Sequence, residues 1–284
     1  MVSIPELVDD FVAENDELDA MVAPLDDLAW RNETPAPGFT IQHQIAHLAT
    51  FDAAAVLAIT DRATFDAHRQ TIDLYSEKNA LDVLLPLTAL GGEDLLHRWR
   101  DTRVKLEDAL LKVPTSERIP WYGPAMSPAS MVTARIMETW AHGQDVADAL
   151  GVTRIPSWRL RHVARLACLA IPYSFRAHGL AVPSVPIRVD LWSEDDRDWS
   201  FGDAGAINHV SGSLQDFCLV MTRRRHPSDV RLQTRGVVAN RWVAIGQTFA
   251  GPPGKGRHAG QFGRHLDGRQ TGLVASRYEQ WRDS

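Results

Sequence analysis

Two short segments of the chain carry histidine and acidic side chains at helical spacing. In TIQHQIAHLATFD, His43 and His47 lie four residues apart. In RIMETWAHGQDVADALG, Glu138 and His142 have the same spacing, and Asp145 follows three residues after His142. Residues at positions i and i+4 of a helix share one face, one turn apart, so each segment can direct two side chains at one point. Imidazole and carboxylate together suit zinc, nickel, iron(II) or manganese, and the sequence does not select among these metals.

Three protein ligands with one further position left for water or substrate is the arrangement of catalytic zinc. Glu138, His142 and one histidine of the first segment therefore predict such a site. The neighbours Ile136, Met137 and Trp140 are apolar, and a carboxylate buried among them needs a compensating partner. On the residues alone, the alternative that this face is simply polar and solvated stays open.

Both segments fall in predicted helices. Thr40 can cap the first of them, and the second has Ser127 at its N-cap, Pro128 at its first position and Gly151 just beyond its end. Four long helices are predicted in this half of the chain, at 4–22, 41–60, 93–113 and 127–151. This pattern indicates an antiparallel four-helix bundle, in which facing helices can supply metal ligands to a shared site.

The texture of the sequence changes after Val182. The segment VPIRVDLW at 185–192 alternates between apolar and polar residues, which predicts a strand, and 197–201 can form its hairpin partner. Further elements are predicted as helices at 157–179 and 211–224 and as strands at 230–234 and 237–245. The predicted fold class is therefore α+β with two domains, a metal-binding helical domain at 1–155 and an α+β domain at 156–284. The latter ends in a tail rich in glycine, proline and basic residues.

Composition and charge restrict the class of protein. The chain has 284 residues and a formal net charge of -6, whereas nucleic-acid binding requires a basic face, so no nucleic-acid partner is expected. No apolar run approaches the length of a membrane span, and the acidic N-terminus does not resemble a signal peptide. The two cysteines, Cys168 and Cys218, indicate a reducing compartment. We expect a cytoplasmic protein without a membrane partner, and the oligomeric state stays open.

The two histidine segments also carry a resemblance to a known family. TIQHQIAHLATFD resembles the T-V-R-D-L-V-A-H-L signature of the DinB-like superfamily, and more closely that of its mycothiol-dependent maleylpyruvate isomerase branch. ETWAHGQDVADALG is similar to the second signature of this family, E-x-x-x-H-x-x-D-V-x-x-A-L-G. The resemblance implies metal ligands at His47, Glu138 and His142. It leaves out His43, because the family has arginine or another polar residue at that position.

The same resemblance implies the architecture and the cosubstrate. It implies a DinB-like helical bundle followed by a small α+β domain similar to sterol-carrier folds, and the stretch WVAIGQTFAGPPGKGR looks like a feature of one actinobacterial subgroup. It further implies a mycothiol-dependent transferase or isomerase whose cofactor is a divalent metal, with zinc the first expectation. A free thiol has a pKa of about 8.5, and coordination to a divalent cation deprotonates it. The resulting thiolate would attack a small electrophilic substrate, in S-transfer, thiol exchange or thiol-assisted isomerisation.

The cluster Arg223, Arg224 and Arg225 lies in the second domain. An arginine from this domain can face the metal cleft in the family, and Arg224 is the matching residue, which could bind a carboxylate of substrate or thiol. The alternative is a solvated helix end, which the helix dipole favours. Asp145 likewise has two interpretations, as an acceptor that orients a ligand histidine or as a group bonded to backbone or solvent.

Two other functions are consistent with the same residues. A metal-dependent hydrolase would use metal-bound hydroxide and no thiol, and turnover that depends on added thiol would distinguish it. A carrier protein would hold an apolar ligand in the second domain and use the metal only structurally. A structural site is closed by a fourth protein ligand, which His43 or Asp145 could supply.

Overall fold

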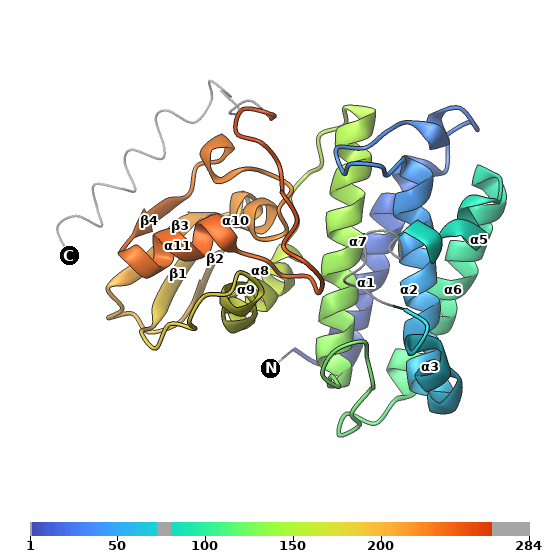
Figure 1. The fold of residues 1–284 in the computed structure, drawn as a ribbon, viewed down its shortest axis with the longest axis horizontal. Helices are drawn as coiled ribbons and strands as arrows, with labels where there is room; N and C mark the ends of the chain where they lie inside the picture. Colours follow the sequence, from blue (N-terminus) through green and yellow to red (C-terminus); the bar gives the residue numbers. More distant parts are fainter. Residues whose placement is uncertain (1, 73–80, 263–284) are drawn as a thin grey trace.

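The computed structural model describes residues 2–72 and 81–262, in which a group of long helices lies beside a smaller half that contains a sheet (Figure 1). The first half contains a 3-10 helix at Ala29–Arg31 and the helices α1 (Ile4–Val22), α2 (Ile41–Thr60), α3 (Arg62–Arg69), α5 (Leu85–Thr88), α6 (Gly92–Lys112) and α7 (Pro128–Leu150). The second half contains α8 (Leu160–Leu169), α9 (Ile171–Ala177), β1 (Ile187–Trp192), β2 (Asp198–Phe201), β3 (Asn208–Ser213), α10 (Leu214–Met221), a 3-10 helix at Pro227–Asp229, β4 (Gln233–Arg235) and α11 (Val237–Ile245). Within the described ranges, no helix combines the length and the apolar composition that a membrane crossing requires.

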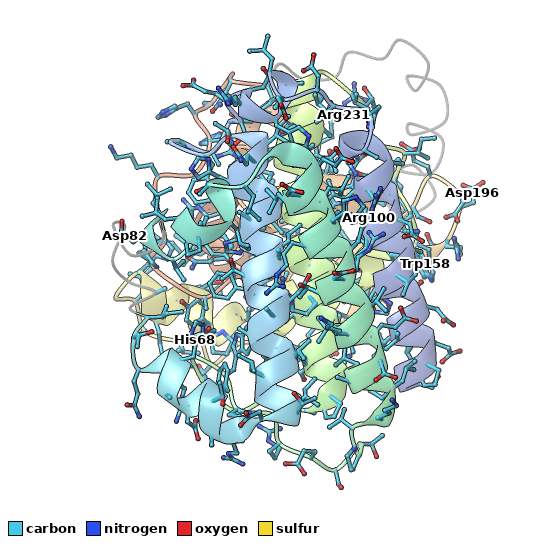
Figure 2. The ribbon with its side chains drawn as sticks, turned by 90° about the vertical axis from the view of Figure 1, so that its right-hand side faces the viewer. His68, Asp82, Arg100, Trp158, Asp196 and Arg231 are labelled. Atoms are coloured by element: carbon cyan, nitrogen blue, oxygen red, sulfur yellow. The ribbon has the colours of Figure 1, made fainter. Side chains whose placement is uncertain are left out.

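The four long helices α1, α2, α6 and α7 pack against one another, and α2 lies between α6 and α7. Their ends agree with the capping signals, since Ser127 accepts a hydrogen bond from a backbone N–H at the start of α7 and Gly151 adopts a φ of 65° after its end. Arg100 of α6, labelled in Figure 2, donates to both carboxylate oxygens of Asp19 on α1, at 2.8 and 2.6 Å. Because α2 and α7 contact each other, the two histidine segments lie on neighbouring helices.

Helix α7 takes part in all three apolar cores. Met131 and Ile136 belong to a core shared with α1, α2 and α6, and Val146 belongs to a second core near the other end of these helices. Met137 and Trp140 instead join the core of the second half, which α8 to α11 and the sheet complete. Because one helix is buried from both sides, its polar residues are fixed relative to both halves of the molecule.

The sheet has the strand order β2-β1-β3-β4, with β1 antiparallel to β2 and parallel to β3, and β3 antiparallel to β4. Strand β1 buries Ile187, Val189 and Leu191 on one face, as the alternating pattern predicts. Helices occupy most of the first half and the four strands lie in the second half, so the prediction of a helix-rich α+β fold is confirmed.

The prediction of a strand at 237–245 is wrong, because this segment forms helix α11. Its β-branched residues favour a strand, but the buried residues Ala239, Trp242 and Val243 follow the spacing i, i+3, i+4. The side-chain oxygen of Asn208 accepts backbone N–H groups at the start of α11, the shorter bond being 3.0 Å. Tertiary packing and this cap therefore override local propensity.

The helix predicted at 157–179 is divided in two. Pro172 lies at the start of α9, and a proline lacks the N–H group that a continuous helix would use there. Strand β3 was not predicted, because NHVSGS contains Val210 as its single large apolar residue. Since β3 extends to Ser213, helix α10 begins at Leu214 rather than at 211.

Candidate metal site

The three predicted ligands meet between α2 and α7. Glu138 Oε2 lies 3.4 Å from His47 Nε2 and 3.3 Å from His142 Nε2. The two imidazole rings are stacked, with centroids 4.1 Å apart, and the potential ligand atoms of all three residues lie within 4.8 Å of one another. We call these three residues the metal cluster.

The spacing and chemistry of the metal cluster fit a divalent ion. Tetrahedral zinc with bonds of about 2.0–2.2 Å has ligand atoms roughly 3.4 Å apart, which is the separation between the carboxylate oxygen and each imidazole nitrogen. The side chains of His47, Glu138 and His142 are 21%, 20% and 11% exposed. Each of the three side chains therefore contacts solvent, so the cluster is not sealed as a closed structural site would be.

The protonation states of Glu138 and His142 are also those of metal ligands. Burial opposes ionisation of Glu138, but the two imidazole side chains beside it outweigh burial and hold the pKa of the carboxyl well below its usual range. Burial, followed by the charge of His47, lowers the pKa of His142 to about 4. At neutral pH the carboxylate is therefore ionised and the His142 imidazole is neutral, as metal binding requires.

Gln44 fixes the orientation of His142, a role that the sequence did not predict. His142 Nδ1 donates to Gln44 Oε1, the amide of Gln44 donates to Thr34 Oγ1 at 2.8 Å, and the hydroxyl of Thr34 donates to the carbonyl of Phe39 at 2.8 Å. Because every donor in this series has an acceptor, the proton of His142 stays on Nδ1 and Nε2 faces Glu138. The signal in the sequence was the position of Gln44, one turn before His47 on the same helix face.

His43 has a different task. Its Nδ1 lies 2.7 Å from Thr40 Oγ1 and accepts the backbone N–H of Thr40 at 3.3 Å, while its own backbone N–H donates to Thr40 Oγ1. This reciprocal arrangement is a capping box at the start of α2. In the part of the chain that the structure describes, His43 does not join the metal cluster.

Asp145 is bound by arginines instead of orienting a ligand histidine. Its side chain is 1% exposed, and its Oδ2 accepts from Arg224 at 2.9 Å. Its Oδ1 accepts from Arg257 at 2.5 Å. Arg224 thus reaches α7 from the second half, next to the metal cluster, and its charge contributes to lowering the pKa of His142. With both oxygens engaged, Asp145 is not placed as a fourth metal ligand.

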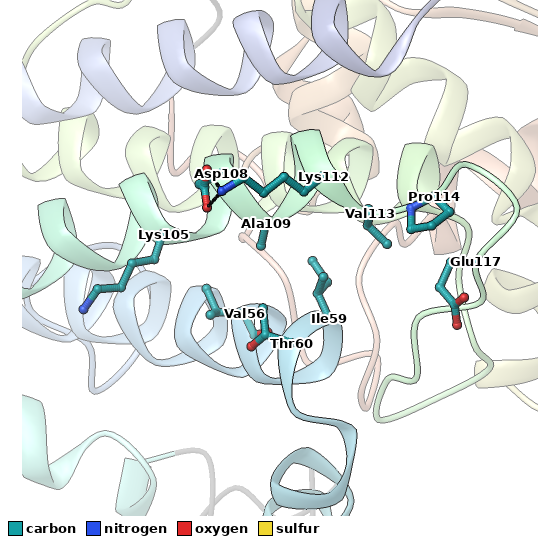
Figure 3. Close-up of a pocket in the computed structure, with 10 residues that line it drawn as sticks. All are labelled: Val56, Ile59, Thr60, Lys105, Asp108, Ala109, Lys112, Val113, Pro114 and Glu117. Carbon is teal, nitrogen blue, oxygen red and sulfur yellow. Dashed lines mark hydrogen bonds and ion pairs between the residues drawn. The ribbon is translucent and has the colours of Figure 1, made fainter.

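A separate surface groove of about 530 Å³ opens between the C-terminal ends of α2 and α6 (Figure 3). It is lined by apolar residues, among them Val56, Ile59 and Ala109, and by charged residues that include Lys112 and Glu117. The groove is lined by none of the predicted site residues and by no histidine or cysteine, so chemistry is not assigned to it.

Comparison with known proteins identifies relatives of both the sequence and the fold. Residues 11–147, which include the whole metal cluster, match the family model of the mycothiol maleylpyruvate isomerase N-terminal domain. An uncharacterized protein of Mycobacterium tuberculosis, from strains CDC 1551 / Oshkosh and H37Rv, is 45% identical over 251 residues, covering 88% of this chain and 97% of the relative.

Two solved structures share the fold. The crystal structure of the mycothiol-dependent maleylpyruvate isomerase aligns with a TM-score of 0.57 and 17% identity, over 82% of this chain and 93% of that chain. A histidine-to-alanine mutant of that isomerase aligns over the same shares with a TM-score of 0.56. The similarity therefore extends beyond the helical half into the sheet-containing half.

Proposed function

The chain belongs to the mycothiol-dependent maleylpyruvate isomerase branch of the DinB-like superfamily, and on this basis we propose that it is a metal-dependent enzyme that uses mycothiol. The reaction would be S-transfer, thiol exchange or thiol-assisted isomerisation of a small electrophilic substrate. The observation that carries the proposal is the metal cluster, whose three ligand side chains converge and remain partly exposed.

Each residue of the site has a distinct role in this proposal. His47, Glu138 and His142 hold the divalent ion, for which zinc is the first expectation. When bound there, the ion would lower the pKa of an adjacent thiol, about 8.5 when free, so that thiolate is present at neutral pH. Gln44 keeps Nε2 of His142 unprotonated and directed at the cluster. Arg224 would bind an anionic group of the substrate or thiol.

The two halves of the molecule are assigned to two domains in this proposal. We assign residues 1–155 to a DinB-like metal-binding bundle and residues 156–284 to an α+β domain similar to sterol-carrier folds. Supporting this division, α8 packs in the core of the second half and contacts α10. Residues 263–284 of the predicted second domain lie outside the described residues. The apolar contacts of Met137 and Trp140 with that core hold the halves together.

Metal analysis of protein purified without chelator tests the site. We expect about one equivalent of divalent metal in wild type and almost none in His47→Ala or His142→Ala, with unchanged helical circular dichroism. His97→Ala is the matched control, because His97 is an exposed histidine on α6 and its loss should leave the metal content unchanged. Full occupancy in both cluster variants would overturn the proposed ligands.

A second assay tests the use of thiol. Metal-loaded enzyme is incubated with maleylpyruvate, the substrate named for the structural neighbour, with and without mycothiol, and isomerised and thiol-linked products are measured. Turnover only with mycothiol supports the proposal. A hydrolysed product that forms equally well without thiol would replace it with metal-dependent hydrolysis. Unfolding on metal removal, without turnover, would instead indicate a carrier with a structural metal.

A further inference from the structure

The chain after α11 returns to α7 as a segment without helix or strand, residues 249–262, which we call the tail segment (Figure 1). Near its start, Gly251 exchanges two hydrogen bonds of 2.9 Å with the hydroxyl of Tyr173. Near its end, the backbone N–H of Gly260 donates to Asp229 at 2.7 Å. The tail segment is therefore attached at both ends to the second half while its middle reaches the helices.

The middle of the tail segment delivers Arg257 to Asp145. Arg257 is 8% exposed and donates to Oδ1 of a carboxylate that is 1% exposed. Arg223 lies against the preceding residue, since a Cβ on Gly256 would be 3.1 Å from two of its guanidinium nitrogens. Arg224 and Arg257 thus share one carboxylate, and Arg223 lies beside the backbone of the tail segment. The tail segment therefore adds positive charge beside the metal cluster.

Arg224 uses only some of its guanidinium hydrogen-bond donors in this arrangement. One terminal nitrogen donates to Oδ2 of Asp145 and the other to the carbonyl of Thr222, both at 2.9 Å. Its Nε is buried and has no partner within the described residues. An arginine facing a carboxylate with two available oxygens prefers to bind both of them. Arg224 does not do so here, and Oδ1 instead accepts a hydrogen bond from Arg257.

We propose that Arg257 is a positioning residue, which by holding Oδ1 of Asp145 confines Arg224 to Oδ2 and leaves donors of Arg224 for an anionic group of the bound thiol or substrate. The inference rests on the proposed function, in which Arg224 binds that group. Without Arg257, the buried Oδ1 would lose its partner, and Arg224 would turn to bind both oxygens of Asp145. Arg257 itself need not touch the ligand.

Calorimetric titration of the zinc-loaded, full-length protein with mycothiol measures this role. Arg257→Ala should raise the dissociation constant at least tenfold, about 1.4 kcal/mol, while the zinc content stays at the wild-type value. Arg257→Lys, which retains one charged donor, should fall between the two. Lys255→Ala is the matched control, because it removes a positive charge from an exposed position of the same segment and should bind mycothiol as wild type does.

Crystal structures of wild type and Arg257→Ala give a readout that does not depend on the thiol. We expect Arg224 to bind both oxygens of Asp145 in the variant. An unchanged Arg224, or equal affinities of Arg257→Ala and wild type for mycothiol, would overturn the positioning role. Equal weakening by Lys255→Ala would also overturn it. If wild type does not bind mycothiol, the proposed function fails, and the position of Arg224 in the two crystal structures still decides this inference.

Discussion

Helices α2 and α7 direct polar side chains at each other at two levels, and the two levels are built differently. At one level, Arg135 donates to Asp52 at 2.8 Å, and the two side chains are 3% and 0% exposed. At the other level, Glu138 lies between two imidazoles, and all three side chains are partly exposed. The first carboxylate has an arginine as its partner, whereas the ion-pair partners of the second are two histidines.

The difference in partners separates a structural ion pair from a candidate metal site. Burial raises the pKa of Asp52 against the opposing charge of Arg135, and both side chains of this pair are almost fully shielded from solvent. The pKa of Glu138 is instead held low, so the carboxylate is anionic beside an imidazole that is neutral at neutral pH. A divalent cation can neutralise this charge and use the nitrogen lone pairs. The same helix pair is therefore sealed at one level and open to a ligand at the other.

The largest effect on stability is expected when the ion pair between Arg135 and Asp52 is removed. Arg135→Met leaves the buried carboxylate of Asp52 without its cation, which typically lowers the free energy of unfolding by about 3–5 kcal/mol. Urea denaturation measures the change. Arg62→Met is the control, since Arg62 is an exposed cation 3.9 Å from its acidic neighbour and should change stability by less than about 0.5 kcal/mol.

The metal content of Arg135→Met tests whether the two levels are independent. We expect the variant to bind as much zinc as wild type at a temperature where it is folded, because the ion pair of Arg135 is made with Asp52 and not with a member of the metal cluster. Loss of zinc from folded protein would show that the metal cluster depends on the pair of Arg135 and Asp52. The distinction between the two levels would then be wrong.

A smaller effect, on metal affinity, is expected for Gln44, which contacts the candidate ligand His142 at the open level. Gln44→Leu removes the acceptor for His142 Nδ1, and such outer partners typically contribute 10–100-fold to metal affinity. Gln42→Leu is a matched control on the same helix, because Gln42 donates to the carbonyls of Thr88 and Leu90. Competition with a metal-binding dye measures both variants. Equal affinities would mean that Gln44 does not set the tautomer of His142.

The sequence predicted those parts of the molecule that depend on local signals. The ends of α2 and α7 follow from Thr40, Ser127 and Gly151, and helical spacing identified residues that the structure brings together as the metal cluster. Local patterns carry no information on partners far apart in the chain. Arg257 and Asp145 are separated by 112 residues, so their contact could not be predicted.

The errors in the sequence-based predictions also arise from contacts between residues that are far apart in the chain. The local pattern of segment 237–245 predicts a strand. The segment is nevertheless helical because Asn208, from another element, caps it and because Trp242 is buried in the core of the second half. Gln44 and His142 meet only because α2 and α7 are neighbours. The candidate metal ligands were predicted from residue types, helical spacing and the family resemblance, whereas the residues that orient them required the tertiary structure.

The smallest effect is expected at His43, which shares a helix and a residue type with His47. His43→Ala should leave zinc content unchanged and remove a capping interaction of up to about 1 kcal/mol from α2. Burial lowers the pKa of His43 below 6.5, so the unfolded chain takes up the proton first. The contribution of His43 is therefore complete above about pH 7 and is lost as the pH falls below 6.5.

Urea denaturation at a series of pH values compares wild type with His43→Ala. The difference in unfolding free energy between them should shrink as the pH is lowered from about 7 toward 5, because a protonated Nδ1 cannot accept the N–H of Thr40. If the difference in unfolding free energy does not change with pH, protonation of His43 does not weaken the cap of α2. Loss of zinc in His43→Ala would place His43 with the metal cluster, and the distinction between the two histidines would then have to be abandoned.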